Sequence, residues 1–254
     1  EYILSIQVSL DGFNFSVTDH NRLLVLEEFP VKISSEKFLG RRFNEWLSCT
    51  DLFEKSWAVV RIVYFTGKIT IVPGDFYDYN RQDEIINLIF DKQTGYITRD
   101  NYWPENRCNL LFSVHEDFFK TANQKFPGHQ IIHPATVLNQ KIQPYLEDNK
   151  TTLSLFFENS HFYQILYCNK ELKSVNCYFY NNAEDVLFYV LSVLSSYNII
   201  YSAADLILAG KIELSDEIYK KLNHYTENIS IIKNQINYDP AVFTKPMQRF
   251  ITLI

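Results

Sequence analysis

The sequence predicts an α/β fold built from two similar halves, and two observations support this prediction. Residues 4–25 alternate apolar with polar side chains, and Asp11-Gly12 is a strong two-residue hairpin signal, so three consecutive antiparallel strands are expected there. The same plan of three strands returns over residues 153–179, with a turn at Asn159-Ser160. Helical and strand patterns alternate after each hairpin unit, which is the rhythm of an α/β protein.

The length of the chain agrees with two subdomains. Its 254 residues exceed the usual size of one compact domain, and 46% of them are hydrophobic, which is enough to fill two cores. We expect residues 1–147 to form the first subdomain, with inserted elements around residues 68–103. Residues 148–254 are expected to form the second subdomain.

In the first half, each further element has its own signal. A capping serine at Ser34-Ser35 precedes apolar residues at helical spacing, β-branched and aromatic runs indicate strands, and a proline opens the last helix. The expected elements are a helix up to residue 47, strands at 57–65 and 68–72, a helix at 81–90, strands at 97–103 and 110–114, a helix at 116–125, a short strand at 130–132 and a helix at 134–145.

In the second half, residues 182–197 give the clearest helix pattern of the chain. Asn181 or Asn182 caps its start, acidic residues occupy its first turn, and its apolar interior predicts that it is largely buried. A buried strand at 205–209, a helix at 215–222 and a final strand at 228–232 are expected to follow.

Composition excludes several classes of partner. The net charge is −6 and the basic residues form no cluster, which argues against nucleic acid as a partner. No apolar run approaches the ~20 residues of a membrane span, so no direct membrane insertion is expected. The four cysteines are expected to be free thiols and the protein cytoplasmic. No basic region followed by an apolar core begins the chain, and a sequence that starts at Glu1 is expected to lack some native N-terminal residues.

Six segments together resemble a known family: LSIQVSLDGFNFSVTD, VRIVYFTGKITIVPGDFYD, LLFSVHEDF, NAEDVLFYVLSVL, LILAGKIE and RFITLI. They are similar to an uncharacterised Bacteroidetes family, a domain-of-unknown-function family assigned an actin-like ATPase fold. The resemblance covers essentially the whole chain and implies an actin-like ATPase architecture of two ribonuclease H-like βββαβα subdomains. It does not imply an activity, because this fold hosts kinases, chaperones, filaments and inactive scaffolds.

The resemblance also indicates where a nucleotide would bind if one were bound. Actin-like ATPases wrap the phosphates with both hairpin turns and place glycines under the adenine, which implies Asp11, Gly12, Asn159, Ser160 and Gly210 as cofactor-binding residues. Three features depart from that pattern. The bulky Phe13 follows the first turn, the second turn, Glu158 to Ser160, has no glycine, and Gly210 stands alone where a glycine pair is expected. We therefore predict no cofactor and read Asp11-Gly12 as an ordinary hairpin turn.

The sequence gives little support for nuclease activity, zinc binding or a catalytic triad. A nuclease of this fold needs carboxylates on its first strand to hold metal ions, but the polar face there consists of serine and glutamine. His129 and His133 would lie roughly 13 Å apart along a strand, too far for one zinc ion. His161 is expected to be a surface residue, and no glycine-flanked nucleophile supports a catalytic triad. The sequence therefore predicts no catalytic residue and no metal ligand.

Two functions remain open. The leading one is a non-catalytic scaffold with a degenerate actin-like ATPase fold that binds an unknown protein or peptide, as pilus-assembly and division proteins of this architecture capture an extended peptide. Aromatic residues in or beside the inserted region offer rigid contact area for such a partner, although core and loop packing would explain each of them as well. They are Tyr77, Tyr79, Tyr96, Tyr102 and Trp103. The alternative is an ATP-binding enzyme of the actin-like ATPase class with divergent phosphate loops.

Overall fold

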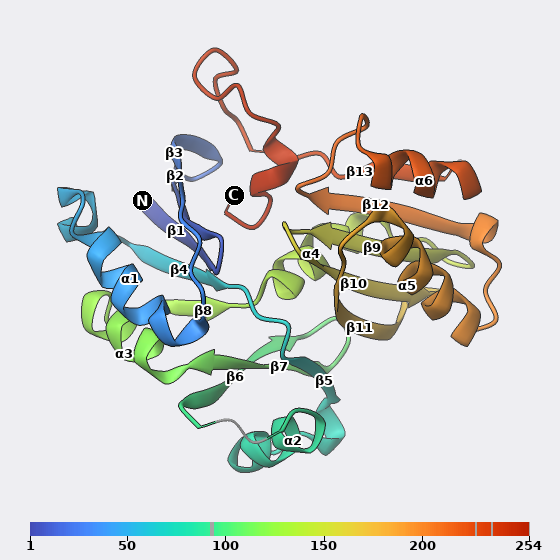
Figure 1. Cartoon of the computed structure of the whole chain (residues 1–254), viewed down its shortest axis with the longest axis horizontal. Coiled ribbons are helices and arrows are strands. Elements are labelled where there is room, and N and C mark those ends of the chain that lie inside the picture. Colours follow the sequence, from blue (N-terminus) through green and yellow to red (C-terminus); the bar gives the residue numbers. More distant parts are fainter. Residues whose placement is uncertain (92–93, 227, 235, 254) are drawn as a thin grey trace. The chain divides into compact units, whose positions relative to one another are not determined.

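The computed structural model describes residues 1–91, 94–226, 228–234 and 236–253. Contacts between residues divide the chain into two compact units, whose elements are labelled in Figure 1. The first unit contains residues 1–134, 235–245 and 252–254, and the second contains residues 135–234 and 246–251. The second unit thus begins at Ala135. The predicted boundary between the two subdomains at residue 147 stays a prediction.

The main sheet of the first unit has the order β3-β2-β1-β4-β8. Its strands are β1 (Tyr2–Ser9), β2 (Gly12–Asp19), β3 (Arg22–Pro30), β4 (Val59–Tyr64) and β8 (Gln130–Ile132). The first three pair antiparallel, whereas β4 runs parallel to β1 and β8 runs parallel to β4. β1 is buried on both faces from Leu4 to Ser9, as expected for a central strand.

Aromatic side chains join this sheet to helices α1 (Leu39–Leu47) and α3 (Glu116–Lys125). Phe13 on β2 stacks on Trp46 of α1 with ring centroids 5.0 Å apart, and Phe43 of α1 meets Phe118 of α3 at 5.1 Å. All four rings are buried. They form the apolar contact that fixes both helices against the first unit's sheet.

The inserted elements form a separate antiparallel sheet of the first unit with the order β5-β7-β6. Its strands are β5 (Ile69–Pro73), β6 (Tyr96–Trp103) and β7 (Cys108–His115), and helix α2 (Gln82–Ile89) lies beside it. Ile86 of α2 packs against Val72 and Leu111 in a small core of its own. The sequence predicted these strands but not that they leave the main sheet.

The sheet of the second unit has the order β11-β10-β9-β12-β13, with the same strand directions as the main sheet of the first unit. Its strands are β9 (Thr151–Phe157), β10 (His161–Cys168), β11 (Glu171–Phe179), β12 (Ala204–Gly210) and β13 (Ile229–Ile231). Helices α4 (Pro134–Ile142), α5 (Ala183–Ser196) and α6 (Glu217–Tyr225) complete the helical elements, with short 3-10 turns at Glu36–Phe38, Asp51–Glu54, Gly74–Phe76, Tyr79–Arg81, Gln143–Tyr145, Tyr201–Ala203 and Met247–Phe250. The predicted secondary structure is therefore confirmed element by element, while an origin by duplication stays a prediction.

Helix α5 is less buried than its sequence predicted. Val190 and Leu194 are fully buried against the second unit's sheet, in agreement with the apolar pattern. Leu191 is only half-buried and Phe188 is 64% exposed, so the expected burial is greatest on one face of the helix. α5 packs on the sheet through one apolar stripe, with Leu187, Tyr189 and Leu191 half-buried at the edge of that core and Phe188 exposed.

The C-terminal residues contribute to both units. In the first unit, Leu23 of β3 donates its backbone N–H to the carbonyl of Asn237 at 2.9 Å, and the Ser16 hydroxyl donates to the carbonyl of Leu253 at 2.6 Å. In the second unit, the Gln248 amide donates to the carbonyl of Ile212 at 3.4 Å. Asn237 thereby covers part of the edge of β3, which would otherwise offer unpaired backbone groups.

Candidate functional site

The first hairpin turn is tied to the chain that follows β3. The turn residues are Leu10 and Asp11, and Gly12 already belongs to β2, so the prediction of Asp11-Gly12 as the two turn residues is wrong by one position. The Asp11 N–H donates to the Ser9 hydroxyl at 3.2 Å. The Leu10 and Asp11 carbonyls accept backbone bonds from Ile33 at 2.7 Å and from Val31 at 3.1 Å. Backbone groups of this turn are thus used within the first unit.

Gly12 is needed for packing at this point. Its φ of +131° lies in a region that L side chains rarely adopt, and an added Cβ would lie 2.2 Å from the Phe29 carbonyl oxygen. A glycine here is explained by the close approach of β2 to β3, without any ligand. The Phe13 side chain points into the core and stacks on Trp46. Its bulk therefore does not block the approach of a ligand to the first turn, contrary to what the sequence suggested.

The second turn places Asn159 and Ser160 on the surface between Glu158 and His161. The Glu158 N–H donates to the His161 carbonyl at 2.9 Å, which closes the hairpin. Tyr180, after β11, donates its hydroxyl to the Glu158 carbonyl at 2.6 Å and its N–H to the Ser160 carbonyl at 3.1 Å. The second turn is therefore held in place by two hydrogen bonds from Tyr180.

An ion pair with a buried carboxylate lies beside this turn. The Glu158 carboxylate is 1% exposed, and the Lys211 ammonium lies 2.7 Å from its Oε2 atom. Burial, followed by the charge of Glu158, raises the pKa of Tyr180 to about 12. The sequence reading missed this pair because its members are 53 positions apart, although Lys211 follows the strand that pairs with β9.

Gly210 is adjacent to the pair and is also explained by packing. Its φ is +83°, and an added Cβ would lie 2.2 Å from the Phe157 carbonyl oxygen at the end of β9. The Lys211 N–H donates to the same carbonyl at 2.8 Å. Thus Asn159, Ser160 and Gly210 lie near one another in the second unit, whereas Asp11 and Gly12 lie in the first.

Two of the three histidines discussed in the sequence, His129 and His133, bond to backbone carbonyls. His129 Nδ1 lies 3.0 Å from the Phe126 carbonyl, and His133 Nε2 lies 3.0 Å from that of Thr66. Burial lowers the pKa of His129, which favours the neutral ring. Among the described residues, no three His, Cys, Asp or Glu side chains gather as they would around a metal ion. His161 is half-buried and lies 3.2 Å from the Tyr163 hydroxyl.

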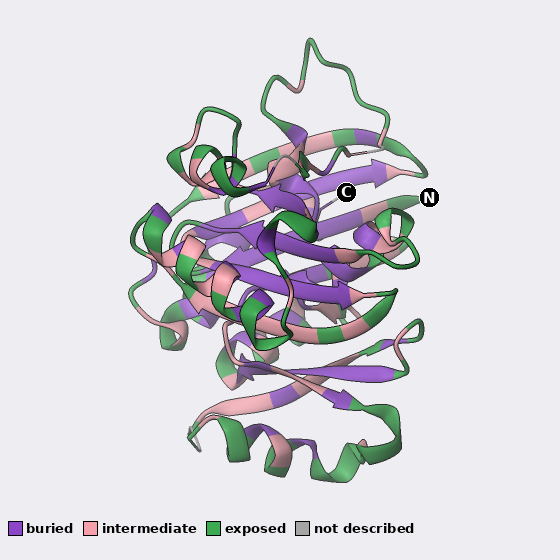
Figure 2. Ribbon diagram, turned by 90° about the vertical axis from the view of Figure 1, so that its right-hand side faces the viewer, coloured by how far each residue is buried: buried purple, intermediate pink, exposed green. Residues whose placement is uncertain are grey.

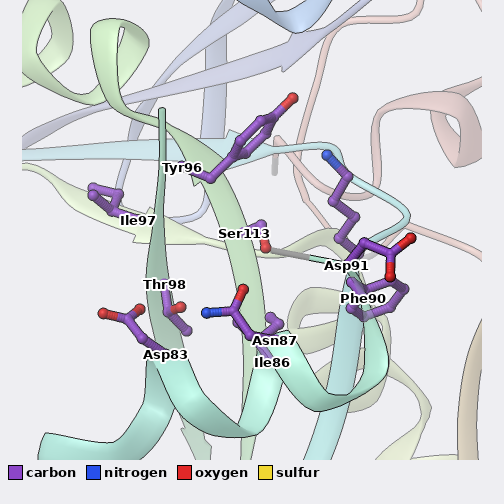
Figure 3. A pocket seen from close by; sticks show the side chains of 10 residues that line it. Asp83, Ile86, Asn87, Phe90, Asp91, Tyr96, Ile97, Thr98 and Ser113 are labelled. Carbon is purple, nitrogen blue, oxygen red and sulfur yellow. The ribbon is translucent and has the colours of Figure 1, made fainter. Parts of the chain in front are cut away.

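A pocket of about 270 Å³ lies between α2 and the inserted sheet, shown in Figure 3. Its lining includes Asp83 and Asn87 of α2, together with Tyr96 and Lys68. The Lys68 ammonium lies 3.8 Å from the centre of the Tyr96 ring and 3.8 Å from a carboxylate oxygen of Glu36. Burial lowers the pKa of Lys68, and burial, followed by the bond to Glu36, raises that of Tyr96.

The aromatic residues of the inserted region divide between core and surface. Trp103 is fully buried, Tyr77 and Tyr96 are half-buried, and Tyr79 and Tyr102 are exposed. Packing therefore explains Trp103, while the exposed tyrosines serve no core. The described part of the chain contains no helix long and apolar enough to span a membrane.

Comparison with known proteins identifies a family and a fold. Residues 1–229 match the family described as "Protein of unknown function (DUF3822)". No curated protein matches the chain. A Bacteroides thetaiotaomicron VPI-5482 protein with actin-like ATPase fold and unknown function is 19% identical, with a TM-score of 0.83 over 99% of this chain and 95% of that one. A chain of the PilM-PilN type IV pilus biogenesis complex is 10% identical, with a TM-score of 0.63 over 98% of this chain and 94% of that one.

These matches confirm the predicted resemblance and the predicted fold class. Both similar structures share less than 25% sequence identity with this chain. The similarity therefore shows the fold of the chain but not its biochemical activity. The protein belongs to the DUF3822 family of unknown function, and its fold is that of the actin-like ATPases.

Proposed function

We propose that this protein is a non-catalytic scaffold that binds a protein or peptide and that its nucleotide site is degenerate. The observation that carries the proposal is the ion pair of the buried Glu158 carboxylate with Lys211 beside the second turn. The carboxylate that would face a metal–phosphate group is already neutralised by an ammonium of the same chain. A magnesium ion would have to displace that ammonium from a largely dehydrated site, which is costly.

The two glycines support the same proposal. Backbone amides meet phosphate only where glycines leave room for the ligand. Gly12 and Gly210 instead leave room for the carbonyl oxygens of Phe29 and Phe157. Neither glycine is then evidence of a phosphate site.

The architecture is compatible with a scaffold. A chain of similar fold is found in the PilM-PilN type IV pilus biogenesis complex, where two proteins assemble. From this similarity we propose only that the present protein also binds another protein. The free thiols of its four cysteines support a cytoplasmic location, and the common strand order of the two five-stranded sheets supports an origin by internal duplication of segments 1–147 and 148–254.

Thermal unfolding with and without millimolar ATP and magnesium tests the proposal. A ligand at 100 times its Kd adds about 2.7 kcal/mol, which corresponds to roughly 5–10 °C for a chain of this size. We expect a shift below about 1 °C, the same with ATP as with magnesium alone.

A rise of several degrees that requires ATP and is lost in Asp11→Ala would contradict the scaffold proposal. It would support the alternative, an ATP-binding enzyme with divergent phosphate loops. Asp11 is the suitable position for this variant because it lies in the turn but not in the core.

A further inference from the structure

The helical layer beside the inserted sheet presents large apolar side chains to the outside. We call Phe76, Tyr79, Leu88 and Ile89 the α2 surface, and they are 78%, 62%, 85% and 55% exposed. Figure 2 shows this layer at the bottom of the view, with exposed residues on its outer side. A single exposed apolar residue is ordinary, but several within 14 consecutive positions indicate an interaction site.

The fold of the first unit does not account for these residues. α2 already packs through Ile86, which contacts Val72 and Leu111, with Ile85 and Phe90 at the edge of that core. Leu88 and Ile89 follow Ile85 at intervals of three and four residues, so they extend the apolar stripe of the helix beyond its contact with the sheet. The exposed part of the stripe is therefore available for a second contact.

The charged residues along the α2 segment are mostly acidic. Residues 75–91 contain five acidic residues and one basic residue, which gives a net charge of −4. The basic residue, Arg81, is paired with Glu84 at 2.9 Å. Asp75, Asp78 and Asp83 take part in none of the ion pairs found between described residues within 4.0 Å. The acidic residues around this apolar surface repel phosphate groups, which disfavours binding to anionic membranes or nucleic acids.

We propose that the α2 surface binds an amphipathic helix of a partner protein, with apolar residues on one face and lysines or arginines along its flanks. This inference rests on the proposed scaffold function and names the surface and the partner's chemistry. The apolar face would cover Leu88, Ile89 and the two aromatic residues, as in other helix-on-groove contacts. The basic flanks would meet the acidic rim, which orients the helix and speeds its association.

One part of the acidic rim lies beside the pocket. Asp83 and Asn87 lie one helical turn apart and line the pocket beside the inserted sheet, as Figure 3 shows. A basic side chain that reaches over this flank meets the Asp83 carboxylate and the Asn87 amide oxygen. Lys68 lines the same pocket, so the expected contribution of this contact is smaller than that of the apolar residues.

Fluorescence anisotropy with designed peptides tests the inference on the full chain. The probe is a labelled peptide of about 18 residues in which leucines and lysines follow the helical period. A leucine–glutamate peptide of the same pattern and a scrambled leucine–lysine peptide are the controls. We expect the patterned leucine–lysine peptide to bind at least tenfold more tightly than either control.

Variants of the protein locate the contact. Leu88→Glu combined with Ile89→Glu should weaken binding at least tenfold, and Asp83→Asn with Glu84→Gln should weaken it about threefold and reduce its dependence on salt. Phe188→Glu on α5 is the matched control, because Phe188 is a similarly exposed apolar residue of the second unit. It should leave the affinity unchanged.

Equal binding of the patterned and scrambled peptides, or equal losses in the α2 and Phe188 variants, would overturn the inference. That result would leave the scaffold proposal intact, because the latter depends on the response to ATP. An ATP-dependent rise in melting temperature would overturn the scaffold proposal whatever the peptide does.

Discussion

Replacing Lys211 by methionine should destabilise the protein strongly. Methionine keeps most of the length and apolar stem of the side chain but removes the ammonium from a carboxylate that is 1% exposed. Breaking a buried ion pair from one side costs about 3–5 kcal/mol, because the remaining charge stays out of water. For a chain of this size that loss lowers Tm by roughly 6–20 °C.

The loss should also depend on pH in a definite direction. Without the ammonium, Glu158 avoids the cost of a buried charge by taking up a proton, which is easier at low pH. The folded state of the variant then binds a proton that the unfolded state releases, so its stability falls as pH rises. Urea unfolding of parent and variant should therefore show a larger difference at pH 8 than at pH 5.

Two further variants make the experiment decisive. Lys173→Met removes the ammonium that lies 2.7 Å from Glu171, a surface pair, and should leave Tm almost unchanged. Glu158→Leu combined with Lys211→Met removes both charges and should recover much of the stability. The reasoning would be refuted if Lys211→Met lowered Tm no more than Lys173→Met and the effect did not depend on pH. The Glu158 carboxylate would then not depend on Lys211 for its stability in the folded protein.

Three shorter predictions follow from packing and burial. Leu194→Ala should cost about 2–5 kcal/mol in urea unfolding and Leu191→Ala clearly less, since only Leu194 is fully buried; equal losses would contradict the observed face of α5. Gly12→Ala should lower the unfolding free energy by at least ~2 kcal/mol, because the new Cβ would meet a backbone carbonyl at 2.2 Å, and an unchanged Tm would refute this contact. In a thiol titration of the native protein at pH 8, the exposed Cys49 should react first, whereas burial raises the pKa of Cys108 to about 11 and should keep it unreactive until unfolding.

The sequence predicted the elements well because local patterns determine them. The helix at 116–125 and the strand at 130–132 agree with the structure at both ends, since acidic residues open that helix and turn residues separate the two elements. The partners of the strands were harder to predict. β7 reads like a strand of the main sheet, yet it pairs with β5 and β6, because pairing depends on contacts that periodicity does not encode.

The candidate site was less predictable than the fold. The resemblance implied the glycines at positions 12 and 210 as nucleotide-binding residues only if a nucleotide were bound. Each faces a backbone carbonyl that only the folded chain brings near. The pairing of Glu158 with Lys211 likewise requires β12 to lie beside β9. Both features follow from tertiary contacts, so a reading of residue types at the turns could not find them.

The discontinuous composition of the first unit has a consequence for the order of folding. The hydrogen bond between Ser16 and Leu253 joins residues 237 positions apart, and Asn237 bonds to the strand that begins at Arg22. During synthesis, the N-terminal sheet would emerge long before the residues that cover its edge. Until then, β3 offers backbone donors and acceptors to other nascent chains, and closure of so long a loop slows the final step. The first unit consists of three segments, residues 1–134, 235–245 and 252–254, so no single cut in the chain could release it whole.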